Sequence, residues 1–210
     1  DAMAASRPGE SEKVMADRLL LNMIKNGADG TTFLVFGSGP RSGMAHALPT
    51  ERVPGPSEII RFDFGGSYGP WQSDFARTYS TGEPTPVQRQ TYTALRRAQA
   101  DTVEVIRPGA AAEDVFFACR DAFGKHGLNF IMPHVGHGFG IELHETPMLR
   151  PGNKTRLVPG MVLNVEPLTL DEQRSGYQLE DLVLVTPQGF RLLTHGLAPE
   201  EIPVIGSKIA

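Results

Sequence analysis

The chain of 210 residues contains an internal repeat, and this repeat limits the folds that are open to it. The triplet Arg-Pro-Gly occurs at residues 7–9 and again at 107–109. Val-Pro-Gly occurs at residues 53–55 and again at 158–160. The spacing between the two copies is nearly the same for both triplets, which indicates two halves of similar length. Such self-similarity predicts a duplicated unit folded about a pseudo-twofold axis.

Both halves show the same succession of patterns. Each Arg-Pro-Gly is followed by an amphipathic helix pattern that ends in glycine, which stops helices because it adopts left-handed backbone angles without strain. These helices are predicted over residues 11–27 and 111–127. Each Val-Pro-Gly is followed by a strand–turn–strand pattern, with strands predicted at residues 59–64, 73–79, 161–166 and 177–185. A longer helix, about residues 85–106, separates the halves, and the sequence predicts an α+β fold with antiparallel sheet.

Composition excludes several classes of protein. Apolar residues make up 40% of the chain and charged residues 21%, which is typical of a soluble globular protein. The net charge of −4 gives no reason to expect a nucleic-acid partner or an anionic membrane surface. No stretch has the roughly 18 apolar residues of a spanning helix, so no membrane partner is expected. The single cysteine, Cys119, and the lack of a signal-peptide pattern predict a reducing, cytoplasmic compartment.

Four carboxylates lie within the predicted strands, where apolar neighbours dominate. They are Asp63, Asp74, Glu166 and Glu180, one on each strand of the two hairpins. Buried carboxylates need a partner, because an isolated charge out of water costs many kcal/mol. Two hairpins that face each other would gather all four, and His137, flanked by glycines, would add an imidazole. This set predicts a centre of two divalent metal ions with bridging carboxylates.

The chemistry of the ligands narrows the choice of metal ion. Oxygen-rich ligation with a single imidazole suits Mn²⁺, Fe²⁺ or Co²⁺, with Zn²⁺ as a further option. Manganese is the predicted ion.

Two further histidines are predicted to face a substrate. His144 follows His137 by seven residues in an extended or looping segment, and a catalytic role competes with a structural hydrogen bond to the backbone. His46 lies before the first hairpin, where a place in the pocket wall competes with an exposed loop position. His134 could belong to the site or to the scaffold.

The motifs that hold these residues follow one another in a fixed order: Asp63-x-Gly65, Ser73-Asp74-x-Ala76-Arg77-Thr78, Gly136-His137-Gly138-x-Gly140, His144-Glu145, Val165-Glu166-Pro167 and Leu179-Glu180-Asp181. In this order the chain resembles the pita-bread metallopeptidases from about Arg7 to Leu193. That family includes methionine aminopeptidases and Xaa-Pro peptidases, and the motifs look more like the Xaa-Pro branch (prolidase and aminopeptidase P). The resemblance implies the pita-bread (creatinase/aminopeptidase) fold.

The resemblance also implies roles for single residues. Asp63 would bind one metal, His137 and Glu166 the other, and Asp74 and Glu180 would bridge both. Glu166 would also shuttle a proton, while His46 and His144 would contact the substrate. The implied reaction is hydrolysis of an Xaa-Pro bond, N-terminal or in a dipeptide, by a metal-bridging hydroxide.

Departures from the family pattern leave alternatives open. Many Xaa-Pro enzymes carry an arginine two residues before the last glutamate, where this chain has Gln178. His134 precedes His137 by three residues instead of the usual four, and the loop before Glu180 is short. A metal-dependent small-molecule amidohydrolase or lyase on the same fold is therefore the second hypothesis. A non-enzymatic binding module is the third, although the chain keeps all five ligands and lacks a basic surface signature.

The start of the chain has the pattern of a last helical turn that runs into Arg7. Residues 1–210 are therefore expected to form a single catalytic domain that lacks its first helix and an N-terminal domain. The full-length protein is expected to be a homodimer.

Overall fold

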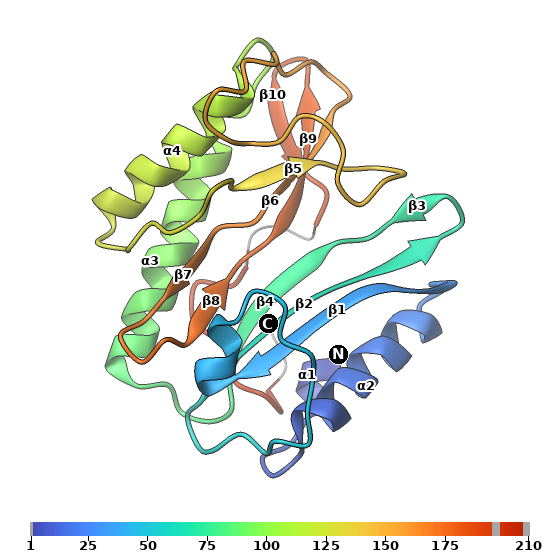
Figure 1. The fold of residues 1–210 in the computed structure, drawn as a ribbon, viewed down its shortest axis with the longest axis vertical. Coiled ribbons are helices and arrows are strands. Elements are labelled where there is room, and N and C mark those ends of the chain that lie inside the picture. Colours follow the sequence, from blue (N-terminus) through green and yellow to red (C-terminus); the bar gives the residue numbers. More distant parts are fainter. Residues whose placement is uncertain (1, 195–197, 208–210) are drawn as a thin grey trace.

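The computed structural model describes residues 2–194 and 198–207, and the first half of the chain places one long helix beside one sheet (Figure 1). The helices are α1 (Ala2–Ala5) and α2 (Glu12–Lys25). The sheet contains β1 (Gly30–Ser38), β2 (Ile59–Tyr68), β3 (Trp71–Gln72) and β4 (Phe75–Ser80), with the 3₁₀ helix η1 (Gly39–Gly43) after β1. Strand β2 pairs antiparallel with each of the other three strands.

The second half repeats this arrangement with additions. Its helices are α3 (Pro86–Val103) and α4 (Ala112–Lys125). Its sheet has the order β10-β9-β6-β5, formed by β5 (Gly136–Gly138), β6 (Val162–Val165), β9 (Asp181–Thr186) and β10 (Gly189–Leu192). A separate antiparallel pair joins β7 (Leu168–Leu170) and β8 (Gly176–Gln178). Among the described residues, no helix is both long and apolar enough to cross a membrane.

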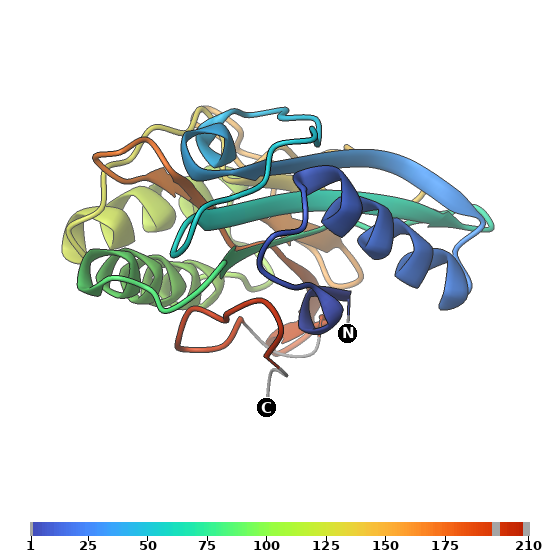
Figure 2. The same ribbon diagram turned by 90° about the horizontal axis from the view of Figure 1, so that it is seen from below.

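The duplication that the repeat predicts is present in the structure. Helices α2 and α4 each have 14 residues and follow the two Arg-Pro-Gly triplets. Both end at a glycine with left-handed backbone angles, Gly27 (φ 96°) and Gly127 (φ 72°), as expected. In both views α2 lies beside β1, well separated from α3 and α4, which pack on each other (Figures 1 and 2).

Each half has its own apolar core. The larger core packs α3 and α4 against the second sheet and includes Tyr92, Leu95, Phe123, Leu163 and Val183. The smaller core packs α1 and α2 against the first sheet and includes Met3, Met15, Leu19, Phe36 and Ile60. Because each half buries its own apolar face, the surface where the halves meet can carry polar and charged groups.

One predicted strand, over residues 177–185, is interrupted in the structure. The pattern over residues 177–185 predicts a continuous strand, but the structure has β8 and β9 with a break between them. The chain changes partners at this break. Both backbone N–H groups beside the break donate to β4. That of Gln178 donates to Oγ1 of Thr78 (2.9 Å), and that of Glu180 donates to the carbonyl of Ala76 (3.2 Å). The break therefore joins the two halves and places Glu180 between them.

A buried carboxylate organises the loop that follows β1. Glu12, in the first turn of α2, is fully buried. One oxygen accepts the N–H (2.9 Å) and hydroxyl (2.7 Å) of Ser38, and the other accepts the N–H (3.1 Å) and hydroxyl (2.8 Å) of Thr50. Arg41 Nε lies 3.3 Å from both oxygens. Glu12 thus ties both ends of the segment that carries His46 to α2.

Replacing Glu12 by alanine should lower stability strongly. The change leaves the buried N–H of Ser38 and the N–H of Thr50 without acceptors and Arg41 without its partner, which costs about 3 kcal/mol. For a chain of this size the melting temperature should fall by about 6–12 °C in a thermal denaturation experiment. The matched control is Glu104→Gln at the exposed end of α3, which should change stability by less than about 0.5 kcal/mol. Equal melting temperatures for both variants would contradict this role of Glu12.

Candidate metal centre

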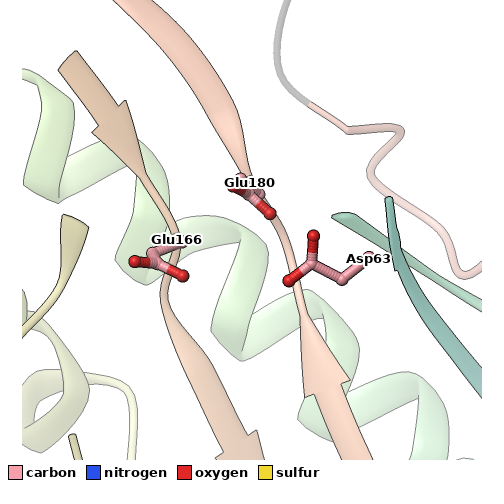
Figure 3. A group of neighbouring side chains, drawn as sticks. All are labelled: Asp63, Glu166 and Glu180. Atoms are coloured by element: carbon pink, nitrogen blue, oxygen red, sulfur yellow. The ribbon is translucent and has the colours of Figure 1, made fainter. Parts of the chain in front are cut away.

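The predicted ligands converge, although only two of the five lie within strands. Asp63 is in β2 and His137 in β5. Asp74 directly precedes β4, Glu166 directly follows β6, and Glu180 directly precedes β9. Carboxylate oxygens of Asp63, Glu166 and Glu180 all lie within 4.8 Å of one another (Figure 3). The prediction that each carboxylate lies on a strand is thus corrected for three of them, which stand directly beside the end of a strand.

Strand register explains how each pair meets. Val165 pairs with Asp181, so Glu166 and Glu180 occupy the next opposed positions, just beyond the ladder. In the first half Asp63 pairs with Ala76, which places Asp74 diagonally across from Asp63. Opposed and diagonal side chains on one face of an antiparallel pair are close enough to interact. The prediction of cross-strand neighbours therefore holds directly for the second hairpin and diagonally for the first.

His137 presents an unprotonated nitrogen to the carboxylates. Its side chain is 1% exposed, and its Nδ1 lies 2.9 Å from the carbonyl of Gly138, which assigns the ring proton to that nitrogen. Its Nε2 lies 3.8 Å from Oδ2 of Asp74 and 3.8 Å from Oε1 of Glu166. Burial lowers the pKa of His137 to about 4. The neutral ring thus turns a lone pair toward two carboxylates, an arrangement that a cation between them would stabilise.

Burial raises the pKa of all four carboxyl groups. The pKa of Asp74 rises to about 7 and that of Glu166 to about 8, in each case through burial first and then through the charge of Asp63. Burial also raises the pKa of Asp63, and it raises that of Glu180 well above its usual range. Without a cation, part of this cluster holds protons at neutral pH.

Several ligand atoms in the cluster have no hydrogen-bond partner. They are Oδ1 of Asp63, Oε1 of Glu166 and Oε2 of Glu180, and all three are shielded from solvent. Buried acceptors without donors are costly, and a divalent ion supplies what they lack. Four carboxylates and one neutral imidazole are also the donor types that bind Mn²⁺, Fe²⁺, Co²⁺ or Zn²⁺. The residues present therefore fit a metal centre.

Glycines beside His137 allow the backbone to pack closely. A side chain at Gly136, whose φ is 149°, would meet the carbonyl of Asn164 at 1.9 Å. One at Gly138 would meet the carbonyl of Thr146 at 2.5 Å. The glycines thus let β5 lie against β6 and against the loop that leads from His144, as the sequence indicates.

The cluster lies in a cavity of about 760 Å³ that also contains the predicted substrate-facing histidines. His46 and His144 both line it and are exposed to solvent, and the rings of His144 and His137 have centroids 4.2 Å apart. His134 lines it too, with Nδ1 3.5 Å from Oε1 of Glu166. Much of the remaining wall is apolar: Phe33, Leu34, Val35, Ile131, Met132, Pro133, Leu143 and Leu168.

Two polar side chains next to the ligands were missed in the sequence, and a third was noted only as a departure. The missed residues are Arg61 and Asn164, and the third is Gln178. Asn164 Nδ2 donates to Glu180, while Arg61 Nη1 donates to Gln178, whose amide in turn donates to Asp63. Each stands two residues before a ligand, and side chains two apart on a strand share a face. That spacing could have identified these three side chains from the sequence.

A buried ion pair supports the site from behind. Arg77 donates to the carboxylate of Asp181 (2.5 Å) and to the carbonyl of Glu180 (2.5 Å). Asp181 is fully buried and also accepts from Gln99 and Thr194. The ion pair thus holds the chain in place directly after Glu180.

The metal-free protein should lose stability as pH rises from 6.5 to 9. Asp74 and Glu166 titrate near pH 7 and 8 in the folded state but near pH 4 when unfolded, so their protonated forms stabilise the fold at low pH. His137 acts oppositely, but only below pH 6.5, where the unfolded imidazole protonates. The melting temperature should therefore fall by about 5 °C or more across this window.

Differential scanning calorimetry of chelator-treated protein would measure this slope. Saturating Mn²⁺ should flatten or reverse it, because a metal replaces the protons that the carboxylates hold. The Glu166→Gln variant, metal-free, should show a smaller fall than the parent protein. A melting temperature that stays level from pH 6.5 to 9 without metal would contradict the assignment of raised pKa values to these carboxyls.

Known proteins share this geometry along nearly the whole chain. The family model described as metallopeptidase family M24 matches residues 1–187. The probable dipeptidase PepE of Mycobacterium tuberculosis is 39% identical over 200 residues, which cover 94% of this chain and 53% of that protein. The Xaa-Pro dipeptidase of Pyrococcus furiosus is 31% identical over 188 residues, which cover 89% of this chain and 54% of that protein.

Similarity to a solved structure agrees with these matches. The crystal structure of dipeptidase PepE from Mycobacterium ulcerans superposes with a TM-score of 0.90 at 35% identity, covering 97% of this chain and 55% of that one. The chain thus spans about half the length of the relatives it matches. The α+β pita-bread fold expected from the sequence, with duplicated halves and antiparallel sheets, is confirmed. The chain belongs to metallopeptidase family M24.

Proposed function

We propose that residues 1–210 form the catalytic domain of a metal-dependent peptidase that hydrolyses Xaa-Pro bonds, in dipeptides or at the N-terminus of peptides. One observation carries the proposal: four carboxylates and the neutral His137 converge in a cavity large enough for a small peptide. The names of two relatives, a probable dipeptidase and an Xaa-Pro dipeptidase, support it. Because the chain covers about half of those proteins, the activity is proposed for the full-length protein.

Two divalent ions, with manganese as the first choice, would be held by the five ligands. We assign Asp63 to one ion, His137 and Glu166 to the other, and Asp74 and Glu180 to both. Burial and then the charges of Asp63 and Asp74 raise the pKa of the Glu180 carboxyl, so Asp74 and Glu180 are close enough to interact, in keeping with shared ligation. Bound ions of this kind supply Lewis acidity, which polarises a carbonyl and makes water a nucleophile at neutral pH.

Side chains of this protein would perform the remaining steps. Glu166 has one oxygen without a partner, so it can accept a proton from the attacking water and pass it to the departing amine. His144, beside His137, can donate an N–H to the oxygen of the scissile carbonyl as negative charge develops there. His46, in the loop after β1, can contact the departing amine. The apolar wall, with Leu34 and Ile131, would pack against apolar substrate side chains and exclude water.

A small-molecule amidohydrolase or lyase is the second candidate. Among the residues that line the cavity, Arg61 is the only lysine or arginine, and it is 2% exposed. Within the part of the chain that the structure describes, the cavity wall therefore presents no accessible lysine or arginine for the carboxylate of a dipeptide. This favours a neutral amide substrate, unless residues outside the chain supply the cation.

Ligand and histidine variants should fail in different ways. In the full-length protein, Asp74→Ala and Glu180→Ala should each lose both bound metal and activity, because a shared ligand is removed. His144→Ala should retain metal but lower kcat by about 10²–10³, the usual loss for one group that stabilises the transition state. Metal content by mass spectrometry and initial rates distinguish the two classes. His126→Gln, at the end of α4, is the matched control, and full kcat in His144→Ala would remove that residue from the mechanism.

Substrate preference tests the proposal itself. Manganese-loaded full-length protein should hydrolyse Leu-Pro with a kcat/KM at least about tenfold above that for Leu-Ala. Leu-Pro-Ala-Ala separates an aminopeptidase, which cleaves it, from a dipeptidase, which does not. Turnover of small amides such as N-acetyl amino acids, with none of the three peptides cleaved, would favour the second candidate and reject the peptidase.

A further inference from the structure

Arg61 is a cation buried beside three of the carboxylates, with no place in the proposed chemistry. It lies in β2, two residues before Asp63, and is 2% exposed. Burial lowers its pKa, and the negative charges of Asp63, Glu180 and Glu166 oppose that effect. A buried guanidinium is costly unless its N–H groups are satisfied, so the destination of each N–H indicates its task.

Three of its hydrogen bonds hold the loop that carries His46. Nε donates to the carbonyl of Ser42 (2.6 Å), and Nη2 donates to the carbonyls of Met44 (2.5 Å) and Ala45 (3.2 Å). The last of these carbonyls belongs to the residue directly before His46. Since Met44, Ala45 and His46 are all exposed, the guanidinium gives this stretch a fixed anchor that it lacks on the outer side.

The fourth hydrogen bond reaches a metal ligand through an amide. Nη1 of Arg61 donates to Oε1 of Gln178 (2.6 Å), and Nε2 of Gln178 donates to Oδ2 of Asp63 (3.2 Å). A guanidinium only donates, so it forces the amide oxygen to face Arg61 and the amide nitrogen to face Asp63. This direction leaves Oδ1 of Asp63 without a partner, free for a metal ion.

Position 178 adds a second reason to treat these residues as a unit. The family resemblance predicts an arginine there, but a second guanidinium would face that of Arg61, and two donors cannot pair. Glutamine can accept from Arg61 and donate to Asp63 at the same time, with 3% exposure of its side chain. The unusual residue at position 178 is thus explained by the arginine on the neighbouring strand.

We propose that Arg61 is a positioning residue that joins the two sides of the site: it orients the carboxylate of Asp63 through Gln178 and fixes the loop of His46. The first part of this proposal, the orientation of Asp63, depends only on the candidate metal centre. The second part, the fixing of the His46 loop, rests on the proposed peptidase function. Arg61 acts through other groups, because its hydrogen bonds go to backbone carbonyls and to Gln178.

A double-mutant cycle with Arg61→Met and Gln178→Met tests the relay in the full-length protein. Isothermal titration of the metal-free protein with Mn²⁺ should show affinity reduced by about 10–100-fold in each single variant, as is usual when an outer partner of a ligand is lost. The double variant should lose no more than the larger single loss, because both changes break the same relay. Full additivity of the two losses, or unchanged Mn²⁺ affinity in Arg61→Met, would overturn the relay.

Kinetics separates the loop-fixing part. Arg61→Met should raise KM for the cleaved substrate by about tenfold more than Gln178→Met does, since only Arg61 holds the loop of His46. Equal KM values in the two variants would overturn that part. If the protein binds Mn²⁺ but cleaves none of the peptides, the proposed function fails while the titration still decides the relay.

A milder variant covers the case in which Arg61→Met does not fold, as judged by circular dichroism. Arg61→Lys keeps the charge but cannot donate to the loop and to Gln178 together. It should fold and bind Mn²⁺ about tenfold more weakly. Affinity equal to the parent protein in both Arg61→Lys and Gln178→Met would overturn the proposal.

Discussion

Four carboxylates brought together out of water repel one another, and the rest of this structure holds them in place against that repulsion. Asp63 and Glu180 are held by groups from the other half as well as their own, and Asp63 accepts from Gln178. The backbone N–H of Glu180 donates to β4 of the other half, and Arg77, from the first half, binds the carbonyl of Glu180 and the carboxylate of Asp181. These bonds across the halves fix the distances between ligands, so the site arrives preformed for a cation instead of being gathered by one.

Apolar packing and polar contacts have different roles in this structure. Each half has an apolar core built mostly from its own residues, and these cores supply most of the stability. The contact between the halves is then left to groups such as Thr78, Gln178 and Arg61, all fully or almost fully buried and all hydrogen-bonded. Buried polar networks of this kind give a single geometry when every member is satisfied. The polar contacts between the halves thus fix the geometry of the site, while the two apolar cores supply its stability.

Much of this could be read from the sequence, for physical reasons that differ between elements. The paired triplets and the glycine stops locate α2 and α4 because helix ends are encoded within a few residues. The ligands could be found because charged residues in apolar strands are rarely without a partner. The break at Leu179 and Glu180 could not be found, since strand-forming residues stand on both sides of it and only the partners change. Glu12 was equally hidden, because a glutamate in a first helical turn is typical of solvent-exposed helices too.

The bonds between the halves also bear on how the chain folds. Thr78 and Gln178 are 100 residues apart, and Arg61 and Gln178 are 117 apart. Contacts of such long range form late and slowly, because a large loop must close before they contribute. The ligand cluster can therefore exist only after both cores are in place, so metal ions cannot nucleate folding of this domain. Metal ions held by this cluster would act on the finished fold and would stabilise it against unfolding.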